Sequence, residues 1–481
     1  MTANQPPPAK TDAIIIVGAG IFGLSTAIHL AERGYTNVSL FDKQPYEKTI
    51  YSYLNGCDAA SADINKIIRS AYGSQTIYQN LSLDAVKAWD SWNKELRHDG
   101  LAVPLGMSSR DVLWINNGDL SCTDADTLPE FEKATIENMD KAGYHDTQLV
   151  NNNEHHLRLA KERGIAPRLQ PFSKKLLAVL DTTGGTALAD KACRFALHKA
   201  KRLGVNLILD PKAGNIVSTV EGPSSKVTGV RTADGKSHEA ALVIVACGGW
   251  TPSLIPSLDN FAETTAGSVV IYKIPESSPL RQRFHPSVFP AWSFKIADGA
   301  DAGLYGFPID ENGYVKIGYR GTKYTNPCVQ SDGRERSVPV TRWTDDEQLR
   351  KVPAQALKVI RKFVSEYLPE LADIDIALTR LCWYTDSFDN HYIIDRVPAK
   401  EGLLVVTAGS GHAFKYLPTI GRWVVDIVEG IGLERPEVQA WRWRSLKKDE
   451  TPVNKLMEGS RGQRALRNVA LTTGETSGSK L

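Results

Sequence analysis

The sequence predicts an α/β protein with two interleaved domains, one built on a parallel sheet and one with a mainly antiparallel sheet. Three observations predict this class. A strand–helix–strand unit with a glycine-rich turn opens the chain, and a second apolar strand lies within residues 241–255. The segments between and after them alternate apolar and polar residues and are rich in turns. At 481 residues the chain is also too long for one small core.

The first unit occupies residues 12–43. Residues 13–17 form a continuous apolar run, as expected of a parallel strand buried on both faces. A helix with one apolar face follows and ends at Gly34, and a second strand ends at Asp42. Between the first strand and the helix stands Gly18-x-Gly20-x-x-Gly23.

This unit is a complete dinucleotide-binding fingerprint of the Rossmann type. Gly18 makes the tight turn, Gly20 lets the backbone approach a pyrophosphate, and Gly23 lets the helix pack closely on the strand. The helix N-terminus faces the phosphates, and Asp42 can accept both ribose hydroxyls of an adenosine. The motif alone leaves NAD and FAD open.

The middle of the chain favours FAD. Residues 198–210 are predicted to form a helix and then a strand, and residues 241–255 a second buried strand that ends in Gly248-Gly249. A late strand of this kind is typical of flavoproteins whose FAD domain is assembled from separate segments. No second GxGxxG occurs. A flavoenzyme reduced by NADPH would usually need one, so its absence favours an oxidase reduced by its organic substrate.

The domain boundaries follow from these patterns. We expect a Rossmann-type FAD-binding domain made of residues 1–106, 182–263 and 374–481. Residues 107–181 and 264–373 are expected to form an α+β substrate domain with a mainly antiparallel sheet. Within it, residues 303–321 are predicted to be a hairpin whose loop is centred on residues 311–313.

Composition excludes several classes of protein. The net charge of +2 attracts neither nucleic acid nor an anionic membrane, and the "WRWR" of residues 441–444 is expected to be a solvated face. The six cysteines lie far apart, which predicts neither a metal site nor a disulfide framework. No apolar stretch is long enough to span a membrane. The last residues, Ser479-Lys480-Leu481, spell a peroxisomal address, which implies an import receptor as partner and a peroxisomal location. A monomer is the simplest expectation.

Several ordered motifs go beyond the nucleotide fingerprint: VGAGIFGLSTAIHLAERGY, DINKIIRSAYG, ACGGWTPSL, LYGFP with VKIGY, CWYTDSFDNHYIID and GSGHAFKYLPTIG. Through them nearly the whole chain resembles the sarcosine, pipecolate, saccharopine and fructosyl-amine oxidase family. The resemblance implies that Cys382 is joined through sulfur to the flavin 8α-methyl group, although a lone cysteine is by default a small buried hydrophobe. It implies that Lys316 lies beside the flavin and assists oxygen reduction, although an alternating strand alone would suggest a solvent-facing lysine.

The resemblance also implies the remaining site. The segment around Gly411 and His412 is expected to be a strand, a glycine-rich turn and a helix start that faces the flavin N1–C2=O edge. Lys415 and Arg69 match the residues that bind the substrate carboxylate. The catalytic residues implied are Lys316, Arg69, Lys415, Lys66, His412 and Tyr305. The cofactor-binding residues implied are Gly18, Gly20, Ile21, Phe22, Gly23, Asp42, Lys43, Asn65, Lys66, Gly248, Trp250, Cys382, Gly411, His412, Phe414 and Lys415.

Some positions depart from the sarcosine oxidase pattern. Asn65 and Lys66 stand in place of threonine and arginine, and Lys66 keeps the positive charge near the ring. Arg320 replaces a histidine, which predicts a different cavity and a larger acidic or polar substrate. Glycated-amino-acid oxidases often lack an arginine at the position of Arg69, so its presence favours a substrate other than a sugar amine.

The predicted function is therefore an FAD-dependent oxidase of an N-substituted amino acid or related secondary amine. Hydride transfer to the flavin would give an imine or iminium, and oxygen would be reduced to hydrogen peroxide. N-methyl amino acids, pipecolate and saccharopine are candidate substrates, and fungal secondary metabolism is a candidate setting. The alternatives are a fructosyl-amine oxidase, an NADPH-dependent flavin monooxygenase, and a flavin-bearing binding protein without turnover.

Overall fold

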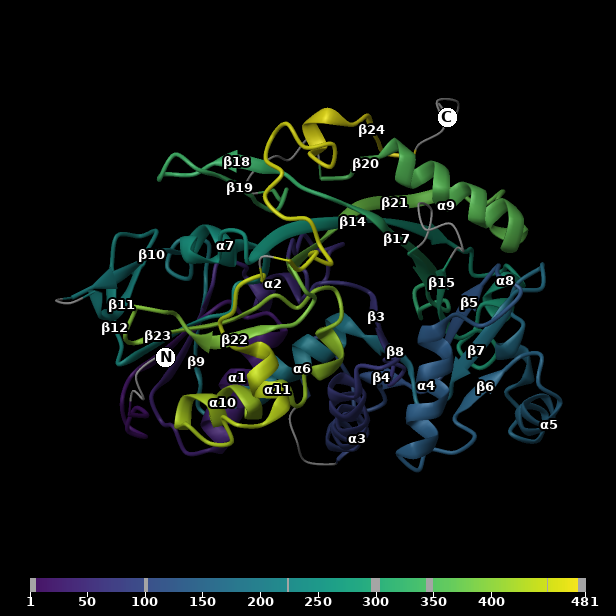
Figure 1. Ribbon diagram of the computed structural model, residues 1–481, viewed down its shortest axis with the longest axis horizontal. Helices are drawn as coiled ribbons and strands as arrows, with labels where there is room; N and C mark the ends of the chain where they lie inside the picture. Colours follow the sequence, from purple (N-terminus) through teal and green to yellow (C-terminus); the bar gives the residue numbers. More distant parts are fainter. Residues whose placement is uncertain are drawn as a thin grey trace.

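The computed structural model describes residues 6–98, 103–222, 225–295, 303–342, 349–447 and 449–474. Two large sheets organise these residues. Figure 1 shows one set of elements around β22, β23 and β9 and another around β5, β6 and β7, with the long strands β14 and β21 running above both.

The first large sheet has six strands in the order β22-β23-β13-β1-β2-β9. The four successive strand pairs from β23 to β9 are parallel, and β22 pairs antiparallel with β23. The strands are β1 (Ile14–Val17), β2 (Val38–Asp42), β9 (Asn206–Leu209), β13 (Leu242–Val245), β22 (Ile393–Arg396) and β23 (Leu403–Thr407). The expected parallel sheet assembled from distant segments is thus confirmed.

Alternate residues of β1 belong to different cores. Ile14 and Ile16 join the largest core, which includes helices α1 (Ile21–Glu32), α6 (Ala189–Arg202) and α10 (Ile420–Glu429). Ile15 and Val17 join a second core with residues of β11 (Val227–Thr232). The apolar run is continuous because both faces of this strand are covered. Figure 1 shows α1 and α10 together on one side of this sheet.

The second large sheet has eight strands in the order β21-β14-β17-β16-β15-β5-β7-β6. All neighbours pair antiparallel except β15 and β5, so the sheet is mainly antiparallel as expected. The strands are β5 (Asp119–Thr123), β6 (Gln148–Val150), β7 (Leu177–Asp181), β14 (Ala262–Lys273), β15 (Ala291–Lys295), β16 (Leu304–Gly306), β17 (Tyr314–Tyr324) and β21 (Ile376–Ser387).

Strand β21 differs from its expected assignment. Residues 374–481 were expected to belong to the parallel-sheet domain, yet β21 pairs with β14 from Ala262↔Ser387 to Tyr272↔Ile376 in the antiparallel sheet. β21 joins the antiparallel sheet through its long backbone ladder with β14, although it is close in sequence to β22 and β23. As a result, the strand that carries Cys382 belongs to the eight-stranded sheet.

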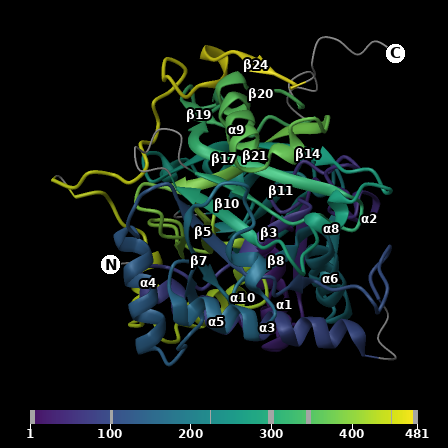
Figure 2. The ribbon, with the colours of Figure 1, turned by 90° about the vertical axis from the view of Figure 1, so that its right-hand side faces the viewer.

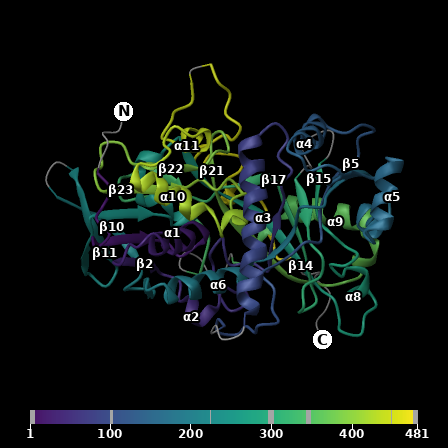
Figure 3. The same cartoon turned by 90° about the horizontal axis from the view of Figure 1, so that it is seen from below.

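Smaller elements complete the fold. Helix α9 (Ala354–Tyr367) packs on the eight-stranded sheet and lies above β17 and β21 in Figure 2. Helix α3 (Thr76–Arg97) runs between the two sets of elements when the molecule is seen from below in Figure 3. The remaining α-helices are α2 (Tyr46–Thr49), α4 (Glu130–Lys141), α5 (Glu154–Glu162), α7 (Thr251–Leu254), α8 (Leu280–Arg283) and α11 (Pro436–Trp441).

The small sheets are short. One has the order β3-β8-β4, another β10-β11-β12, and two are pairs. Their strands are β3 (Asn65–Ile68), β4 (Trp114–Ile115), β8 (Gly185–Leu188), β10 (Ile216–Glu221), β12 (Ser237–Glu239), β18 (Pro327–Val329), β19 (Glu335–Ser337), β20 (Val352–Pro353) and β24 (Leu471–Thr472).

Two local predictions can be compared directly. The hairpin of residues 303–321 is confirmed, because β16 and β17 pair antiparallel with Tyr305 opposite Gly318. The helix expected immediately after the glycine-rich turn is not an α-helix there. A 3-10 turn, η7 (Phe414–Tyr416), comes first, and α10 begins only at Ile420.

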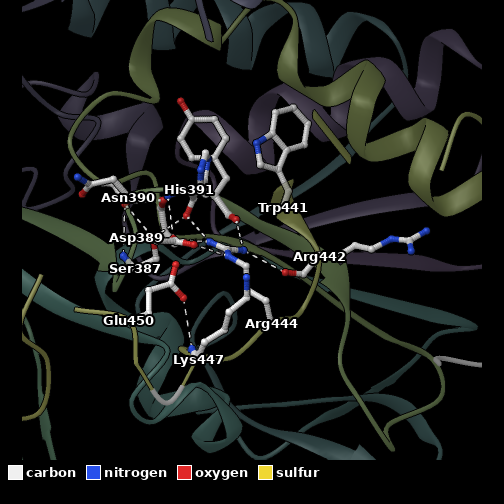
Figure 4. A network of polar contacts seen from close by, with 12 residues as sticks. Ser387, Asp389, Asn390, His391, Trp441, Arg442, Arg444, Lys447 and Glu450 are labelled. Atoms are coloured by element: carbon white, nitrogen blue, oxygen red, sulfur yellow. Dashed lines mark hydrogen bonds and ion pairs between the residues drawn. The ribbon is translucent and has the colours of Figure 1, made fainter. Parts of the chain in front are cut away.

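The expectation that residues 441–444 form a solvated face is wrong. Trp441 is fully buried, and its ring N–H donates to the Tyr78 hydroxyl at 3.3 Å. Arg444 donates two hydrogen bonds of 2.6 Å to the Asp389 carboxylate and others to the carbonyls of His391 and Tyr392. Figure 4 shows this network, with Arg442 pointing away from it. The basic run therefore anchors the loop between β21 and β22.

Within the described ranges, no helix is long and apolar enough to cross a membrane. The same residues contain no group of three or more His, Cys, Asp or Glu side chains arranged to hold a metal ion. The tripeptide at residues 479–481, which was expected to be a peroxisomal address, lies outside the described residues.

Candidate active site

A cavity of about 560 Å³ runs from the glycine-rich turn after β1 to strand β21. Gly18, Gly20 and Asp42 lie on its wall near β1 and β2, and Lys66 and Cys382 lie on its wall from β3 and β21. Its lining also includes the predicted residues Ile21, Phe22, Lys43, Gly248, Trp250, Gly411 and Phe414. A single cavity thus joins most of the cofactor residues that the sequence analysis brought together from distant segments.

The glycine-rich turn has the geometry that its spacing predicts. Gly18 has a φ of +104°, and a Cβ atom there would lie 2.5 Å from the Ala246 carbonyl oxygen of the neighbouring strand loop. A Cβ atom on Gly23 would lie 1.7 Å from the Gly18 carbonyl oxygen, so only glycine allows the helix to pack this close. Gly23 therefore acts through packing and is not itself part of the cavity wall.

The start of α1 fits an anionic phosphate group. Its N-cap is Gly20, which has no side chain to cap the helix, and Gly20, Ile21 and Phe22 all face the cavity. Aligned peptide dipoles and free N–H groups make such a helix start attractive to anions. A side chain at Gly20 would occupy this space, about 3.1 Å from the Ser61 hydroxyl.

Asp42 ends β2 at the same cavity. Its carboxylate accepts backbone N–H groups from Ala19 and Gln44, each at 2.8 Å. Burial raises its pKa, against the lowering effect of these hydrogen bonds. Beside it, the Lys43 ammonium lies 3.5 Å from the centre of the Trp250 ring. These contacts hold Asp42 at the place expected for ribose recognition.

Lys66, Lys316 and Arg380 share one buried carboxylate, that of Asp63. Lys66 and Lys316 lie 2.8 and 2.9 Å from its Oδ2, and Arg380 lies 2.9 Å from its Oδ1. Lys316 also donates to the Asn65 backbone carbonyl at 2.6 Å. The cluster holds three cationic groups around one anion, and so carries excess positive charge beside the cavity.

Burial and ion pairing act against each other in this cluster. Burial would raise the pKa of Asp63, but Arg380, Lys316 and Lys66 together hold it well below its usual range. Burial lowers the pKa of Lys316 to about 8, and Lys66 and Arg380 contribute to this lowering against the attraction of Asp63. For Lys66 burial also disfavours the charge, but Asp63 raises the pKa above its ordinary value.

Cys382 is buried on β21, and its sulfur lies 3.6 Å from the Lys66 ammonium. It is a free cysteine. A positive charge near sulfur stabilises a thiolate, the reactive form of cysteine. In the same region, the Tyr305 and Tyr384 hydroxyls lie 3.5 Å apart. Burial, and then the neighbouring Cys382, raise the pKa of Tyr305 to about 12 and keep the phenol neutral.

Arg69 and Lys415 are not on the wall of this cavity, although Gly411, four residues before Lys415, is. Arg69 follows β3, three residues beyond Lys66, and its guanidinium lies 5.3 Å from the centre of the Tyr72 ring. The Lys415 ammonium donates to the Tyr72 hydroxyl at 2.7 Å and to the His412 carbonyl at 3.3 Å. Burial, followed by repulsion from Arg69, lowers the pKa of Lys415 well below its ordinary value.

His412 is held behind this group and does not face the cavity. Its Nε2 donates to the Asn390 carbonyl at 3.1 Å, so Nδ1 accepts from the Tyr72 or Tyr392 hydroxyl, each also at 3.1 Å. Burial and then Lys415 lower its pKa well below the usual range, so the imidazole is neutral. Through these hydrogen bonds His412 holds the turn after β23, while its neighbour Gly411 lines the cavity.

Asn65 also departs from its expected position. It lines a second cavity of about 320 Å³, and only its backbone carbonyl contacts Lys316. The side-chain oxygen of Asn65 is buried and has no hydrogen-bond partner among the described residues. Thus the two residues Asn65 and Lys66 lie on opposite sides of strand β3, as alternation along a strand requires.

Sequence reasoning missed several residues of the site. Asp63 and Arg380 organise the cationic cluster, Tyr384 lies on the cavity wall, and Tyr72 connects Lys415 with His412. A signal for Asp63 existed, because an acid stands immediately before the strand "INKII" that carries Lys66. No pattern in the sequence pairs Arg380 with Asp63, more than 300 positions away.

The chain is similar to proteins of known activity. A family model described as FAD dependent oxidoreductase matches residues 13–427. L-saccharopine oxidase of Schizosaccharomyces pombe is 27% identical over 90% of this chain and 93% of its own length. Peroxisomal sarcosine oxidase of Mus musculus is 26% identical over 87% of this chain and 93% of its own length.

Solved structures agree in fold. The fructosyl amine oxygen oxidoreductase Amadoriase I from Aspergillus fumigatus superimposes with a TM-score of 0.69 at 25% sequence identity, covering 91% of each chain. The helix start at Gly20, Asp42 and Lys66 all lie on the wall of one cavity. By its fold, its glycine-rich site and a family match that spans most of its length, the chain belongs to the FAD-dependent oxidoreductases.

Proposed function

We propose that the protein is an FAD-dependent oxidase of N-substituted amino acids or related secondary amines, which forms an imine or iminium and reduces oxygen to hydrogen peroxide. The single observation that carries the proposal is the arrangement around β3. This strand carries Lys66 at the cavity beside Cys382, and Arg69 follows three residues later beside Lys415 and Tyr72. This arrangement supports the proposal, because it would set a reaction centre beside a group that can bind a carboxylate.

FAD, when bound, supplies the acceptor for the two electrons of the amine C–H bond and returns them to oxygen. We propose that its phosphates lie at the start of α1, that its adenosine ribose bonds to Asp42, and that its ring end lies near Lys66 and Cys382. The residues Gly20, Asp42 and Lys66 all face the same cavity. In this proposal the six-stranded sheet belongs to the FAD-binding domain and the eight-stranded sheet to the substrate domain.

We propose that Lys316 provides a fixed positive charge for the reduction of oxygen. Its ammonium is fully buried and oriented by Asp63 and the Asn65 carbonyl. A cation held in place before the reaction stabilises negative charge that develops on oxygen without reorganising during the reaction. Lys66, on the cavity wall, adds to the same positive field.

We propose that Cys382 forms the covalent bond to the flavin 8α position. The 3.6 Å approach of Lys66 to the sulfur and the position of Cys382 on the cavity wall support this proposal. Arg69 and Lys415 are proposed to bind the substrate α-carboxylate, since a guanidinium fork and a lysine point charge suit that group.

A fructosyl-amine oxidase is the second candidate, favoured by the similarity to Amadoriase I. Both candidates release peroxide without NADPH, whereas a monooxygenase requires NADPH. The test is a peroxide assay with N-methyl amino acids, pipecolate, saccharopine and fructosyl-lysine, each added without NADPH. Peroxide from the first three classes supports the main proposal. Peroxide from fructosyl-lysine alone supports the second candidate, and no peroxide from any of them contradicts both.

We also propose a peroxisomal location, which suits an enzyme that releases peroxide. The tripeptide Ser479-Lys480-Leu481 and the similarity to a peroxisomal relative support it. A fluorescent protein fused to residues 470–481 should enter peroxisomes, and the same fusion without Leu481 should not. Cytosolic fluorescence from the intact fusion would contradict the proposal.

A further inference from the structure

Arg69, Arg320 and Lys415 are cationic side chains without an ion-pair partner. Among the residues that the structure describes, no carboxylate lies within 4.0 Å of any of them. By contrast, Lys66, Lys316, Arg380 and Lys323 in the same region each contact Asp63 or Asp386 at 2.8 to 2.9 Å. Lys415 is buried, and Arg69 and Arg320 are half-buried. Proteins rarely bury a cation without an ion-pair partner, so Lys415, with two further unpaired cations near it, points to an anionic ligand.

The three cations are connected by a series of contacts. Arg320 donates to the Gly411 carbonyl at 3.4 Å, and Gly411 precedes His412, whose carbonyl accepts from Lys415 at 3.3 Å. Lys415 contacts the Tyr72 hydroxyl, and Arg69 lies over the Tyr72 ring. A continuous set of contacts therefore leads from Arg320 through the turn after β23 to Arg69. Burial is the largest cause of the low pKa of Lys415, and repulsion from Arg69 and Arg320 lowers it further.

Nearby acids do not neutralise this charge. Asp181 accepts hydrogen bonds from the Ser70 and Ala71 backbone, the Gln148 amide and Thr183, so its oxygens are already occupied. Asp119 is buried with one oxygen that lacks a hydrogen-bond partner in the described part of the chain. Burial and then Asp181, against Arg69 and Lys415, raise the pKa of Asp119 to about 7, so it is partly protonated at neutral pH.

Arg320 differs from the other two in position. It lies on β17, on the same face as Gly318 and Lys316, because residues two apart along a strand point to the same side. Its side chain is half-buried, whereas Lys415 is 3% exposed. Arg320 is thus more exposed than Lys415 and stands where a distal part of a substrate would lie. Arg69 is also half-buried, but it contacts Tyr72 beside Lys415 and is assigned with Lys415 to the inner side.

We propose that Arg320 forms a second carboxylate subsite, and that the preferred substrates are N-substituted amino acids carrying a further carboxylate beyond the α-carboxylate. This inference rests on the proposed function and names the substrate class of the same site. Arg69 and Lys415 bind the α-carboxylate, and the Arg320 guanidinium binds the distal carboxylate with two N–H donors. A neutral distal group, such as a sugar or an amide, leaves Arg320 without its anion.

The test compares two substrates that differ only in the distal charge, N-methyl-L-glutamate and N-methyl-L-glutamine. The variants are Arg320→Met, which removes the charge, Arg320→Lys, which keeps it, and Arg158→Met as a matched control on exposed α5. Flavin reduction without oxygen and steady-state peroxide release are measured for each pair. Glutarate and butyrate, which cannot be oxidised, are titrated against the flavin spectrum as a binding readout independent of turnover.

We expect the native enzyme to favour N-methyl-L-glutamate in kcat/KM by about tenfold to a hundredfold, the range of one charge-assisted interaction. Arg320→Met should abolish this preference mainly through KM and weaken glutarate binding to that of butyrate. Arg320→Lys and Arg158→Met should keep most of the preference for N-methyl-L-glutamate. Equal preference in the native enzyme and Arg320→Met overturns the subsite while leaving the oxidase proposal intact. If neither N-methyl substrate reduces the flavin and glutarate does not bind, the oxidase proposal and this inference both fail.

Discussion

The Lys316 ammonium lies 2.9 Å from the Asp63 carboxylate, and each side chain is only 1% exposed. The same carboxylate contacts Lys66 and Arg380. A single buried anion therefore positions two lysines from different strands, Lys66 on β3 and Lys316 on β17. The charge that Asp63 does not compensate remains available to the cavity.

Replacement of Lys316 by methionine should leave reduction by the amine largely unchanged and slow reoxidation by oxygen about a hundredfold or more, because a preorganised charge is lost. Stopped-flow absorbance at the flavin band measures both half-reactions. Lys323→Met is the matched control, since Lys323 lies on the same strand and pairs with buried Asp386 at 2.9 Å. Oxygen reactivity equal to that of the native enzyme would refute the assigned role of Lys316.

Asp63→Asn should destabilise the protein by about 3–5 kcal/mol, because it removes one partner from a buried ion pair. It should also lower the pKa of Lys316 further, since attraction to Asp63 is what opposes burial there. Denaturant unfolding and the pH profile of reoxidation measure the two effects. Asp386→Asn is the control and should reduce stability without moving the pH profile; an equal shift in both variants would contradict the specific role of Asp63.

The oxygen reaction should depend on pH with a midpoint near 8. Burial lowers the pKa of Lys316 to about 8, so the cation is present below this pH and is lost as the pH rises through it. Reoxidation should therefore be fastest below pH 8 and decline above it. Between pH 8 and 10.5 the folded protein binds fewer protons here than the unfolded chain, so the contribution of Lys316 to stability rises with pH. The Lys316→Met profile should be flat; a midpoint near 8 in that variant would assign the titration to another group.

Gly20→Ala and Gly23→Ala should fail in different ways. The Cβ atom at Gly23 meets backbone 1.7 Å away, which no rotamer relieves, so this variant should lose thermal stability with or without cofactor. The Cβ atom at Gly20 lies 3.1 Å from the Ser61 hydroxyl and projects where phosphate is proposed to bind. Gly20→Ala should therefore keep the stability of the apoprotein and lose FAD affinity. Thermal melts of apoprotein and FAD titration separate the two, and an unchanged FAD affinity in Gly20→Ala would contradict the proposed phosphate site.

Cys382→Ser should release its flavin into the supernatant on acid precipitation, whereas the native protein should keep the colour in the pellet. The hydroxyl of serine is a far weaker nucleophile than the sulfur of cysteine. Cys57→Ser, at another buried free cysteine, is the control and should retain the colour. Flavin in the supernatant of the native protein would contradict covalent attachment.

Local sequence patterns predicted the parallel sheet and the β16–β17 hairpin well. The apolar run at residues 14–17, the spacing of the glycines and the acid at residue 42 are short-range signals, and each corresponds to an element at that place. The position of β21 could not be predicted in this way. Its membership of the antiparallel sheet depends on pairing with β14 across more than 100 residues, which no local pattern records.

For the site residues, too, local motifs predicted some positions and tertiary packing determined others. Lys66, Cys382 and Gly411 face one cavity as the resemblance implied. His412 and Asn65 do not, because one ring nitrogen of His412 is bonded to the Asn390 carbonyl and Asn65 points to the other side of its strand. The partners Asp63 and Arg380 emerge only from tertiary packing. Local motifs thus located candidate residues, while tertiary packing determined which side chains contact them.

Strand β21 has one further consequence. It is hydrogen-bonded to the antiparallel sheet, yet Cys382 on it lines the cavity that begins at the turn after β1 in the other sheet. A cofactor that occupied the whole length of this cavity would contact both large sheets and connect them. Flavin binding should then be the final step of maturation, and it should protect both sheets together against proteolysis and thermal unfolding.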